Sequence, residues 1–200
     1  MPLEADDLDP DPIRQLVAWV TDAEAAGTEL PTAFALSTAS AAGEPSVRML
    51  LARQIDADGI RFYTNIESRK GRELASNPRA AAAFWWPALN RQARLSGAVE
   101  QLSESETLAY WRTRPRGSRL SALVSAQDEP IASRADLLAA VEASAARFPG
   151  DDVPLPAHWR GYLLRPALVE FWESRADRLH DRIEYRRTSD GGWERRRLQP

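Results

Sequence analysis

Apolar residues recur with two different periods along this chain, and each change of period marks a boundary between helix and strand. Helical spacing begins at Asp11-Pro12, where a capping aspartate precedes a proline at the first helical position, so a helix is predicted from there to Gly27. Alternation typical of half-buried strands follows, and turn sequences at 42–45 and 56–59 favour an antiparallel meander. The predicted strands cover 33–38, 47–54, 60–65, 80–86 and 92–102.

Helical spacing alternates with these strands and then dominates the middle of the chain. Four helices are predicted to begin at a serine, because its hydroxyl can accept a hydrogen bond from the free N–H groups of a first turn. These serines are Ser68, Ser103, Ser118 and Ser133. Strand patterns return at 161–164, 169–172 and 183–187, and a last strand starts at Trp193.

This order of elements predicts a mainly β protein with peripheral helices, an α+β fold whose antiparallel strands form a barrel or a strongly curved sheet. One domain accounts for residues 1–200, since no repeat, linker or low-complexity tract interrupts the pattern. Within it we expect an N-terminal helical segment, a barrel core, a helical insertion and C-terminal strands, over 1–27, 28–102, 103–150 and 160–200 respectively.

Composition excludes several function classes. The chain has no cysteine, which removes disulfides, thiolate metal sites and cysteine nucleophiles, and with only two histidines no metal site is expected. The net charge of −3 gives no reason to expect binding to nucleic acid or to an anionic membrane. Without a long apolar run or a signal peptide pattern, a cytoplasmic location is expected.

Charge is distributed unevenly between the two ends of the chain. Acidic residues gather in the first eleven positions, and arginines gather after position 174. The basic tail is a candidate surface for an anion or a second subunit, with a solvated charged hairpin as the alternative.

The sequence Ser68-Arg69-Lys70-Gly71 places two cations in the first turn of a predicted helix. Basic residues there interact unfavourably with the helix dipole and destabilise the helix by roughly 0.3 to 1 kcal/mol. A bound anion would reverse the sign of this interaction. Backbone N–H groups and two cations together suit a phosphate, and a glycine lets the backbone approach closely. Two solvated side chains are the alternative interpretation.

A second group of arginines, at 114–119, surrounds the helix start predicted at Ser118. Tyr110 precedes Arg114 by one helical turn, so both side chains can face one anion. The alternative is a tyrosine packed over an arginine stem at a surface corner. The two helix starts therefore predict two anion sites.

Two further sets of basic residues are candidates. Arg48 and Arg53 lie in an apolar strand pattern, on opposite faces if the strand is regular, so they should serve different partners unless they reach solvent at the strand ends. Arg178, His180 and Arg182 share one face if their segment is extended, giving a cationic strip around a residue that titrates near neutrality.

In order and spacing, these motifs resemble the pyridoxamine 5′-phosphate oxidase family, whose members use flavin mononucleotide (FMN). The resemblance runs from about Pro31 to Pro200. It rests on the segments 48–53, 62–65, 68–70, 91–92, 110–118, 170–172, 178–182 and 197–200. It implies an FMN-binding split β-barrel, antiparallel and homodimeric, with FMN at the subunit interface.

The resemblance also implies roles for particular residues. The FMN contacts would come from Arg48, Met49, Leu50, Leu51, Tyr63, Thr64, Arg69, Lys70, Gln92, Gln127, Asp128, Trp172 and Arg182. The substrate contacts would come from Arg53, Tyr110, Arg114, Ser118, Arg178 and His180, with Arg178 and His180 as catalytic residues at a pyridine ring. The implied reaction moves a hydride from the C4′ carbon of pyridoxine or pyridoxamine 5′-phosphate to the flavin, and O2 then reoxidises the flavin and gives peroxide.

The sequence departs from the family pattern at three positions. Arg53 replaces the usual lysine, Asp128 replaces the serine of a flavin-contacting Gln-Ser pair, and Leu30 replaces an acidic residue. The first residues also lack the basic, tyrosine-containing arm of well-known members. The alternatives are a related FMN oxidase of another small molecule, such as a phenazine-type intermediate, and a non-catalytic flavin or pyridoxal phosphate binding protein.

Overall fold

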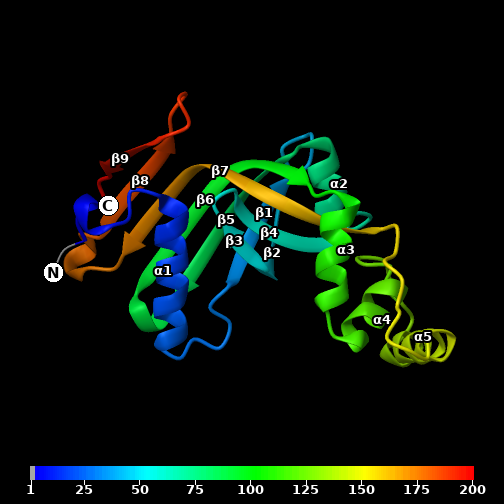
Figure 1. Ribbon diagram of the computed structural model, residues 1–200. Coiled ribbons are helices and arrows are strands. Elements are labelled where there is room, and N and C mark those ends of the chain that lie inside the picture. Colours follow the sequence, from blue (N-terminus) through cyan, green and yellow to red (C-terminus); the bar gives the residue numbers. More distant parts are fainter. Residues whose placement is uncertain (1–2) are drawn as a thin grey trace.

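A computed structural model describes residues 3–200 and contains a single nine-stranded antiparallel sheet (Figure 1). Its main path runs β2-β1-β5-β6-β7-β4-β3, and β8 and β9 continue from β7. The strands are β1 (Ala33–Ala39), β2 (Pro45–Leu51), β3 (Gln54–Asp56), β4 (Gly59–Asn65), β5 (Arg79–Trp86), β6 (Arg91–Gln101), β7 (Trp159–Glu173), β8 (Asp181–Arg187) and β9 (Trp193–Arg197). The α-helices are α1 (Pro12–Ala25), α2 (Arg69–Ser76), α3 (Glu104–Thr113), α4 (Arg116–Val124) and α5 (Arg134–Arg147).

The long strand β7 connects the two ends of the sheet. Its first half pairs with β4, its second half pairs with β8, and β6 runs beside both halves. The register of β6 on β7 shifts between Ser96 and Gly97, and a Cβ at Gly97 would lie 1.9 Å from the Arg165 carbonyl oxygen. The glycine therefore permits a bulge that curves the sheet, and the strands predicted at 161–164 and 169–172 are one continuous strand.

The interior of the curved sheet is aromatic. Phe34 stacks on Phe84 with ring centroids 5.4 Å apart, and both side chains are fully buried. Helix α1 closes one side by placing Trp19 against Phe171, with centroids 4.8 Å apart. A smaller apolar cluster that includes Trp111 and other buried side chains from α4 and β7 joins α3, α4 and α5 at the opposite end of the molecule (Figure 1). The predicted mainly β fold with peripheral helices is confirmed.

Three of the four predicted serine caps are confirmed. Ser68, Ser103 and Ser133 each accept a hydrogen bond from a backbone N–H in the first turn of their helix. The prediction for Ser118 is wrong, because α4 begins at Arg116 directly after Pro115. Proline holds the extended conformation that precedes a helix, so the helix starts without a side-chain cap.

One predicted strand is too long, and the condition that would place Arg178, His180 and Arg182 on one face is not met. The strand predicted over 47–54 ends at Leu51, where buried Ala52 turns a corner by hydrogen bonding to Thr32, and Arg53 bonds instead to Arg61 of β4. Segment 178–182 is not extended at its start, because Asp177 and Arg178 have φ of 55° and 61° and form a short 3-10 turn.

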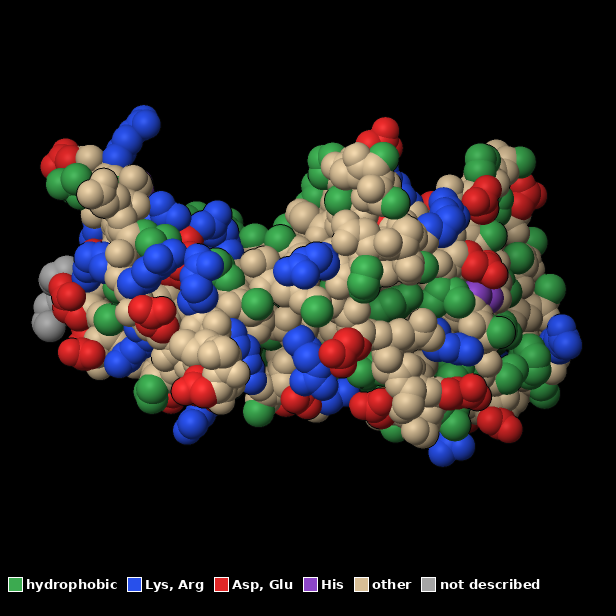
Figure 2. Space-filling model, turned by 90° about the horizontal axis from the view of Figure 1, so that it is seen from above, with side chains coloured by type: hydrophobic (Ala, Val, Ile, Leu, Met, Phe, Trp, Pro, Cys, Tyr) green, Lys and Arg blue, Asp and Glu red, His purple; other side chains and the backbone are tan. Residues whose placement is uncertain are grey.

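The two charged ends of the chain pair with one another. Arg197 contacts Glu4 at 2.9 Å and Asp181 at 2.7 Å, and Arg195 contacts Asp6 at 3.6 Å. Figure 2 shows basic and acidic side chains interleaved over the end of the molecule that carries β8 and β9. Arg195 and Arg197 of the basic tail therefore hold the N-terminal segment in place. No helix within residues 3–200 is both long and apolar enough to cross a membrane.

Candidate active site

The first predicted anion site lies at the start of α2. Ser68 accepts a hydrogen bond from the Gly71 N–H, which fixes Arg69 and Lys70 in the first turn. Arg48 approaches from β2 and donates to the Leu36 carbonyl oxygen at 3.1 Å and to the Thr38 hydroxyl at 2.7 Å. Three cations from two elements therefore meet at one helix N-terminus, as the resemblance implies.

Glu73, which the sequence analysis missed, forms ion pairs with two of these cations. Its side chain lies 2.8 Å from the Nε of Arg69 and 3.6 Å from the Nη2 of Arg48. Burial alone raises the pKa of Glu73, but hydrogen bonds from Ser46, Thr38 and Arg69 outweigh burial and lower the pKa to about 2. The carboxylate is therefore charged at neutral pH and fixes both guanidiniums. Its i,i+4 spacing from Arg69 is the one signal in the sequence.

Lys70 is the least exposed cation of the group, at 3%. Its Nζ donates to the Ser68 hydroxyl at 3.1 Å, and burial lowers the pKa of its ammonium. Gly71 is needed for a reason other than ligand approach, because a Cβ there would lie 2.2 Å from the Ile66 carbonyl oxygen. A cavity of about 410 Å³ opens beside this group and is lined by residues of β2, by Arg69 and Lys70, and by Gln127 and Asp128.

A second cavity of about 460 Å³ adjoins the first, since Leu50 and Gln127 line both. Tyr63, Thr64, Arg114 and Ser118 line it together with Trp159, a residue that the sequence analysis did not single out. The Tyr110 ring stacks on Tyr63 with centroids 3.9 Å apart, at the edge of the same group.

Arg114 carries the most unusual environment in this second cavity. Its guanidinium carbon lies 4.6 Å from the ring centroid of Trp159 and 5.2 Å from that of Trp111, and its Nη1 is buried with no hydrogen-bond partner. Burial lowers the pKa of Arg114, and the charges of Arg53 and Arg119 lower it further. A buried donor without a partner is costly, so an anionic oxygen at this position would be strongly favoured.

Arg114 does not continue the helix that carries Tyr110. Helix α3 ends at Thr113, and Arg114 has an extended backbone with φ of −71° and ψ of 143°. Arg53 is exposed, and its charge acts on Arg114 although the two residues are far apart in the sequence. Of the remaining predicted contacts on β2, Met49 is 64% exposed, and Leu51 is half-buried at the strand end.

The other predicted residues lie on β6, β7 and β8 or in the turn directly before β8. Gln92, Trp172 and Arg182 are direct neighbours across these strands. Arg182 donates to both carboxylate oxygens of Glu170 at 3.0 Å. The His180 ring lies 4.6 Å from the Trp172 ring, and its Nδ1 accepts a hydrogen bond from the Arg175 N–H at 3.1 Å.

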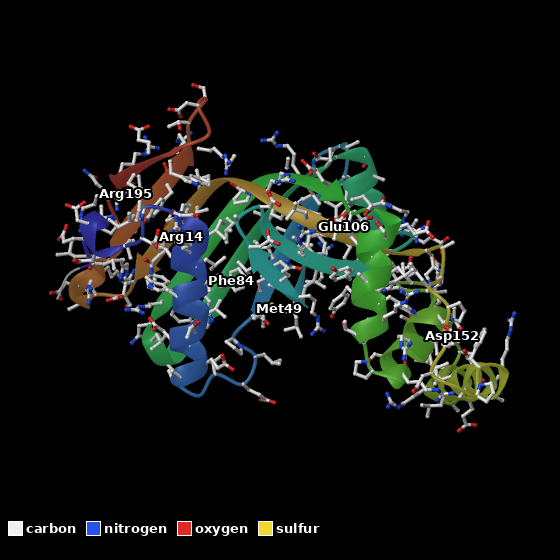
Figure 3. The ribbon with its side chains drawn as sticks, in the orientation of Figure 1. Arg14, Met49, Phe84, Glu106, Asp152 and Arg195 are labelled. Atoms are coloured by element: carbon white, nitrogen blue, oxygen red, sulfur yellow. The ribbon has the colours of Figure 1, made fainter. Side chains whose placement is uncertain are left out.

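One chain does not bring the two groups together. Strands β1, β5, β6 and β7 separate β2 from β8 in the sheet, and neither cavity described above is lined by Trp172, His180 or Arg182. Figure 3 shows Met49 of β2 near the middle of the molecule and Arg195 at the end that carries β8 and β9.

Comparisons with known proteins identify the family of this chain. Residues 20–147 match the family description pyridoxamine 5′-phosphate oxidase, and residues 159–200 match the pyridoxine 5′-phosphate oxidase C-terminal dimerisation region. A relative from Anaeromyxobacter dehalogenans, named pyridoxine/pyridoxamine 5′-phosphate oxidase, is 52% identical over 96% of each chain. A relative of the same name from Cupriavidus metallidurans is 47% identical over 99% of this chain and 93% of its own.

Solved structures show the same fold. PhzG from Burkholderia lata, in complex with tetrahydrophenazine-1-carboxylic acid, superposes with a TM-score of 0.92 at 34% identity, over 99% of this chain and 98% of its own. A pyridoxamine 5′-phosphate oxidase-related, FMN-binding protein from Nostoc punctiforme gives 0.80 at 21% identity over the whole of both chains, which concerns the fold alone. With both parts of its sequence matched, the chain belongs to the pyridoxamine 5′-phosphate oxidase family.

Proposed function

We propose that this protein is an FMN-dependent oxidase that converts pyridoxine or pyridoxamine 5′-phosphate to pyridoxal 5′-phosphate. The observation that carries the proposal is the position of Arg114, which lines a cavity that adjoins a second cationic site and whose buried Nη1 has no hydrogen-bond partner. Two neighbouring anion sites suit a reaction between a phosphorylated cofactor and a phosphorylated substrate. The names of the relatives from Anaeromyxobacter and Cupriavidus support the same assignment.

The residues present fit FMN. Arg48, Arg69 and Lys70 surround the start of α2, where backbone N–H groups and the helix dipole favour a phosphate. Gln127 and Leu50 line both this cavity and the second one, where Tyr63 and Thr64 would contact the rest of the cofactor. Bound FMN supplies a two-electron acceptor that no side chain of this chain provides.

The second cavity would hold the substrate. Arg114, Tyr110 and Ser118 would bind its phosphate, with Arg53 close enough to add to the positive field. Trp159 and Trp111 keep the Arg114 guanidinium in place, so its position does not depend on the ligand. A fixed phosphate sets the distance and orientation of the C4′ carbon, which is the main contribution of the protein to the rate.

His180 would contact the substrate ring, and the structure defines which of its ring nitrogens carries the proton in the neutral form. Because its Nδ1 accepts the Arg175 N–H, a neutral His180 ring carries its proton on Nε2 and can donate it. Arg178 has a positive φ, so the backbone turns at this residue, two positions before His180. The overall reaction takes two electrons and two protons from the alcohol to give an aldehyde, and O2 becomes hydrogen peroxide. For the amine, water also enters and ammonia leaves.

We propose a homodimer in which each site is shared. Gln92, Trp172, Arg178, His180 and Arg182 would come from the partner, because one chain separates them from both cavities. Val47, Met49 and Trp85 expose 66%, 64% and 51% of their surface on the sheet, which is apolar area that a second subunit can bury. The match of residues 159–200 to a dimerisation region supports this assembly.

A phenazine-type substrate is the second candidate, because PhzG superposes over nearly the whole chain. The two candidates differ in the anion that they offer to Arg114, which is a phosphate for the first and a carboxylate for a phenazine-type acid such as the PhzG ligand. The test is to load the protein with FMN, desalt it, and follow flavin absorbance, aldehyde and peroxide with pyridoxine 5′-phosphate in air. A colourless protein would contradict both candidates, and a yellow protein without turnover would favour the second.

A further inference from the structure

The loop between α4 and α5 places a carboxylate in the cationic group that the cofactor phosphate would use. Asp128 Oδ2 accepts a hydrogen bond from the Arg69 N–H at 2.7 Å, and Arg69 is the first residue of α2. Asp128 also lines the cavity of about 410 Å³ together with Arg48 and Lys70. Burial lowers the pKa of both those cations, and the negative charge of Asp128 offsets part of that shift.

We propose that Asp128 is a built-in competitor of the FMN phosphate: its carboxylate occupies the start of α2 in the free protein and must leave when the phosphate binds. The inference rests on the proposed function, because it concerns the same cofactor site. It assigns Asp128 to the control of cofactor affinity, through the phosphate rather than through the flavin ring.

Two carboxylates meet this cationic group, and they differ in how firmly they are held. Glu73 is 5% exposed and accepts hydrogen bonds from Thr38, Ser46 and Arg69, so it stays in place with or without a ligand. Asp128 is exposed and lies in a segment without helix or strand, at 125–133. Glu73 is therefore the permanent counter-ion, and Asp128 is the one that can move.

The backbone at Asp128 is consistent with a loop shaped to deliver this side chain. Its φ is 74°, in the left-handed region that non-glycine residues other than Asn and Asp seldom adopt. The adjacent Gln127 lines both cavities, and the Thr64 hydroxyl lies 3.4 Å from its Oε1. The loop is thus anchored beside the cofactor path, with Asp128 directed to the helix start.

Competition follows from charge and from geometry. The Arg69 N–H cannot make a full hydrogen bond to a carboxylate and to a phosphate oxygen at once, and two anions at one helix N-terminus repel each other. Removing the carboxylate charge should therefore strengthen FMN binding. It should also lower the stability of the FMN-free protein, because the start of α2 loses a charged acceptor and three cations lose a counter-charge.

The experiment compares Asp128→Asn and Asp128→Ser with the wild type and with Asp190→Asn. The control removes the same charge from an exposed turn where Asp190 contacts Thr188. Three quantities are measured: the FMN dissociation constant by flavin fluorescence, the riboflavin dissociation constant, and the melting temperature of the FMN-free protein with and without inorganic phosphate.

Both Asp128 variants are expected to bind FMN about tenfold more tightly, with no change for riboflavin, which lacks the phosphate. They should melt at a lower temperature than wild type without phosphate and gain more from added phosphate. Weaker FMN binding would overturn the proposal and make Asp128 a flavin ligand, and unchanged binding would also overturn it. If no variant binds FMN, the proposed function fails, and the phosphate-dependent melting still decides whether Asp128 competes at the cationic group.

Discussion

Arg114 lies over the Trp159 ring at 4.6 Å from its centroid while the Nη1 of the same guanidinium has no partner. The aromatic contact holds the arginine in place, and the missing partner leaves it ready for an anion. This pairing distinguishes the second cavity from the first, where Arg48 and Arg69 already have Glu73 as a counter-ion.

Replacing Arg114 by Ala should therefore affect the substrate and not the cofactor. We expect KM for pyridoxine 5′-phosphate to rise about 100-fold, which corresponds to the loss of a charged hydrogen bond in a buried site. FMN should stay bound with unchanged affinity, and Arg114→Lys should recover only part of the loss because a point charge does not replace the planar guanidinium. Loss of FMN would show that the two cavities have been assigned the wrong way round.

Glu73 should control the acid stability of the cationic group. Its folded-state pKa is lowered from 4.5 to about 2, so its stabilising contribution is complete above pH 4.5 and is lost as the pH falls towards 2. Glu73→Gln should destabilise the protein at pH 7 by about 2 kcal/mol. It should also flatten the loss of stability between those pH values, as measured by urea unfolding. Equal pH dependence in both proteins would contradict this role.

Gly71 and Gly117 provide a matched pair of substitutions at two helix starts. A Cβ at Gly71 would lie 2.2 Å from the Ile66 carbonyl oxygen, whereas nothing lies within 4 Å of a Cβ at Gly117. Gly71→Ala should shift the start of α2, lower the melting temperature and weaken FMN binding. Gly117→Ala should leave stability unchanged or raise it slightly. Similar behaviour of the two variants would exclude the close contact as the cause.

A shared site predicts complementation between two inactive variants. Arg114→Ala damages the cavity of one subunit, and His180→Ala damages the group that would come from the partner. A mixed dimer would contain one intact site, so random mixing of equal amounts should give about a quarter of wild-type activity. Each variant alone should have little activity when pyridoxine 5′-phosphate is held well below the KM of Arg114→Ala. No recovery in a verified mixed dimer would mean that each site is built from one chain.

The sequence predicts well those features that depend on neighbouring residues. The caps at Ser68, Ser103 and Ser133 follow from local hydrogen bonding. The two cations at the start of α2 are recognisable because they are adjacent in the sequence. Pro115 also acts locally, so its effect on the start of α4 can be recognised in the sequence. The serine pattern instead indicates Ser118 as the cap, which is why that prediction is wrong.

Features that depend on distant partners were not predictable in the same way. The break at Ala52 arises from hydrogen bonds to Thr32 and, at the next residue, to Arg61. Glu73 gains its importance from Thr38 and other residues of β1 and β2, which the sequence alone does not place beside it. Periodicity describes which face a residue occupies, but it does not identify the side chains across the sheet.

Oxygen consumption by the FMN-loaded protein, with pyridoxine 5′-phosphate compared with unphosphorylated pyridoxine, tests the central claim most directly. The account predicts rapid consumption with the phosphorylated compound, matched one to one by aldehyde and peroxide, and little consumption without the phosphate. It also predicts that Arg114→Ala removes most of this preference. Equal rates with both compounds, or no oxidation of either by a protein that retains FMN, would contradict the account.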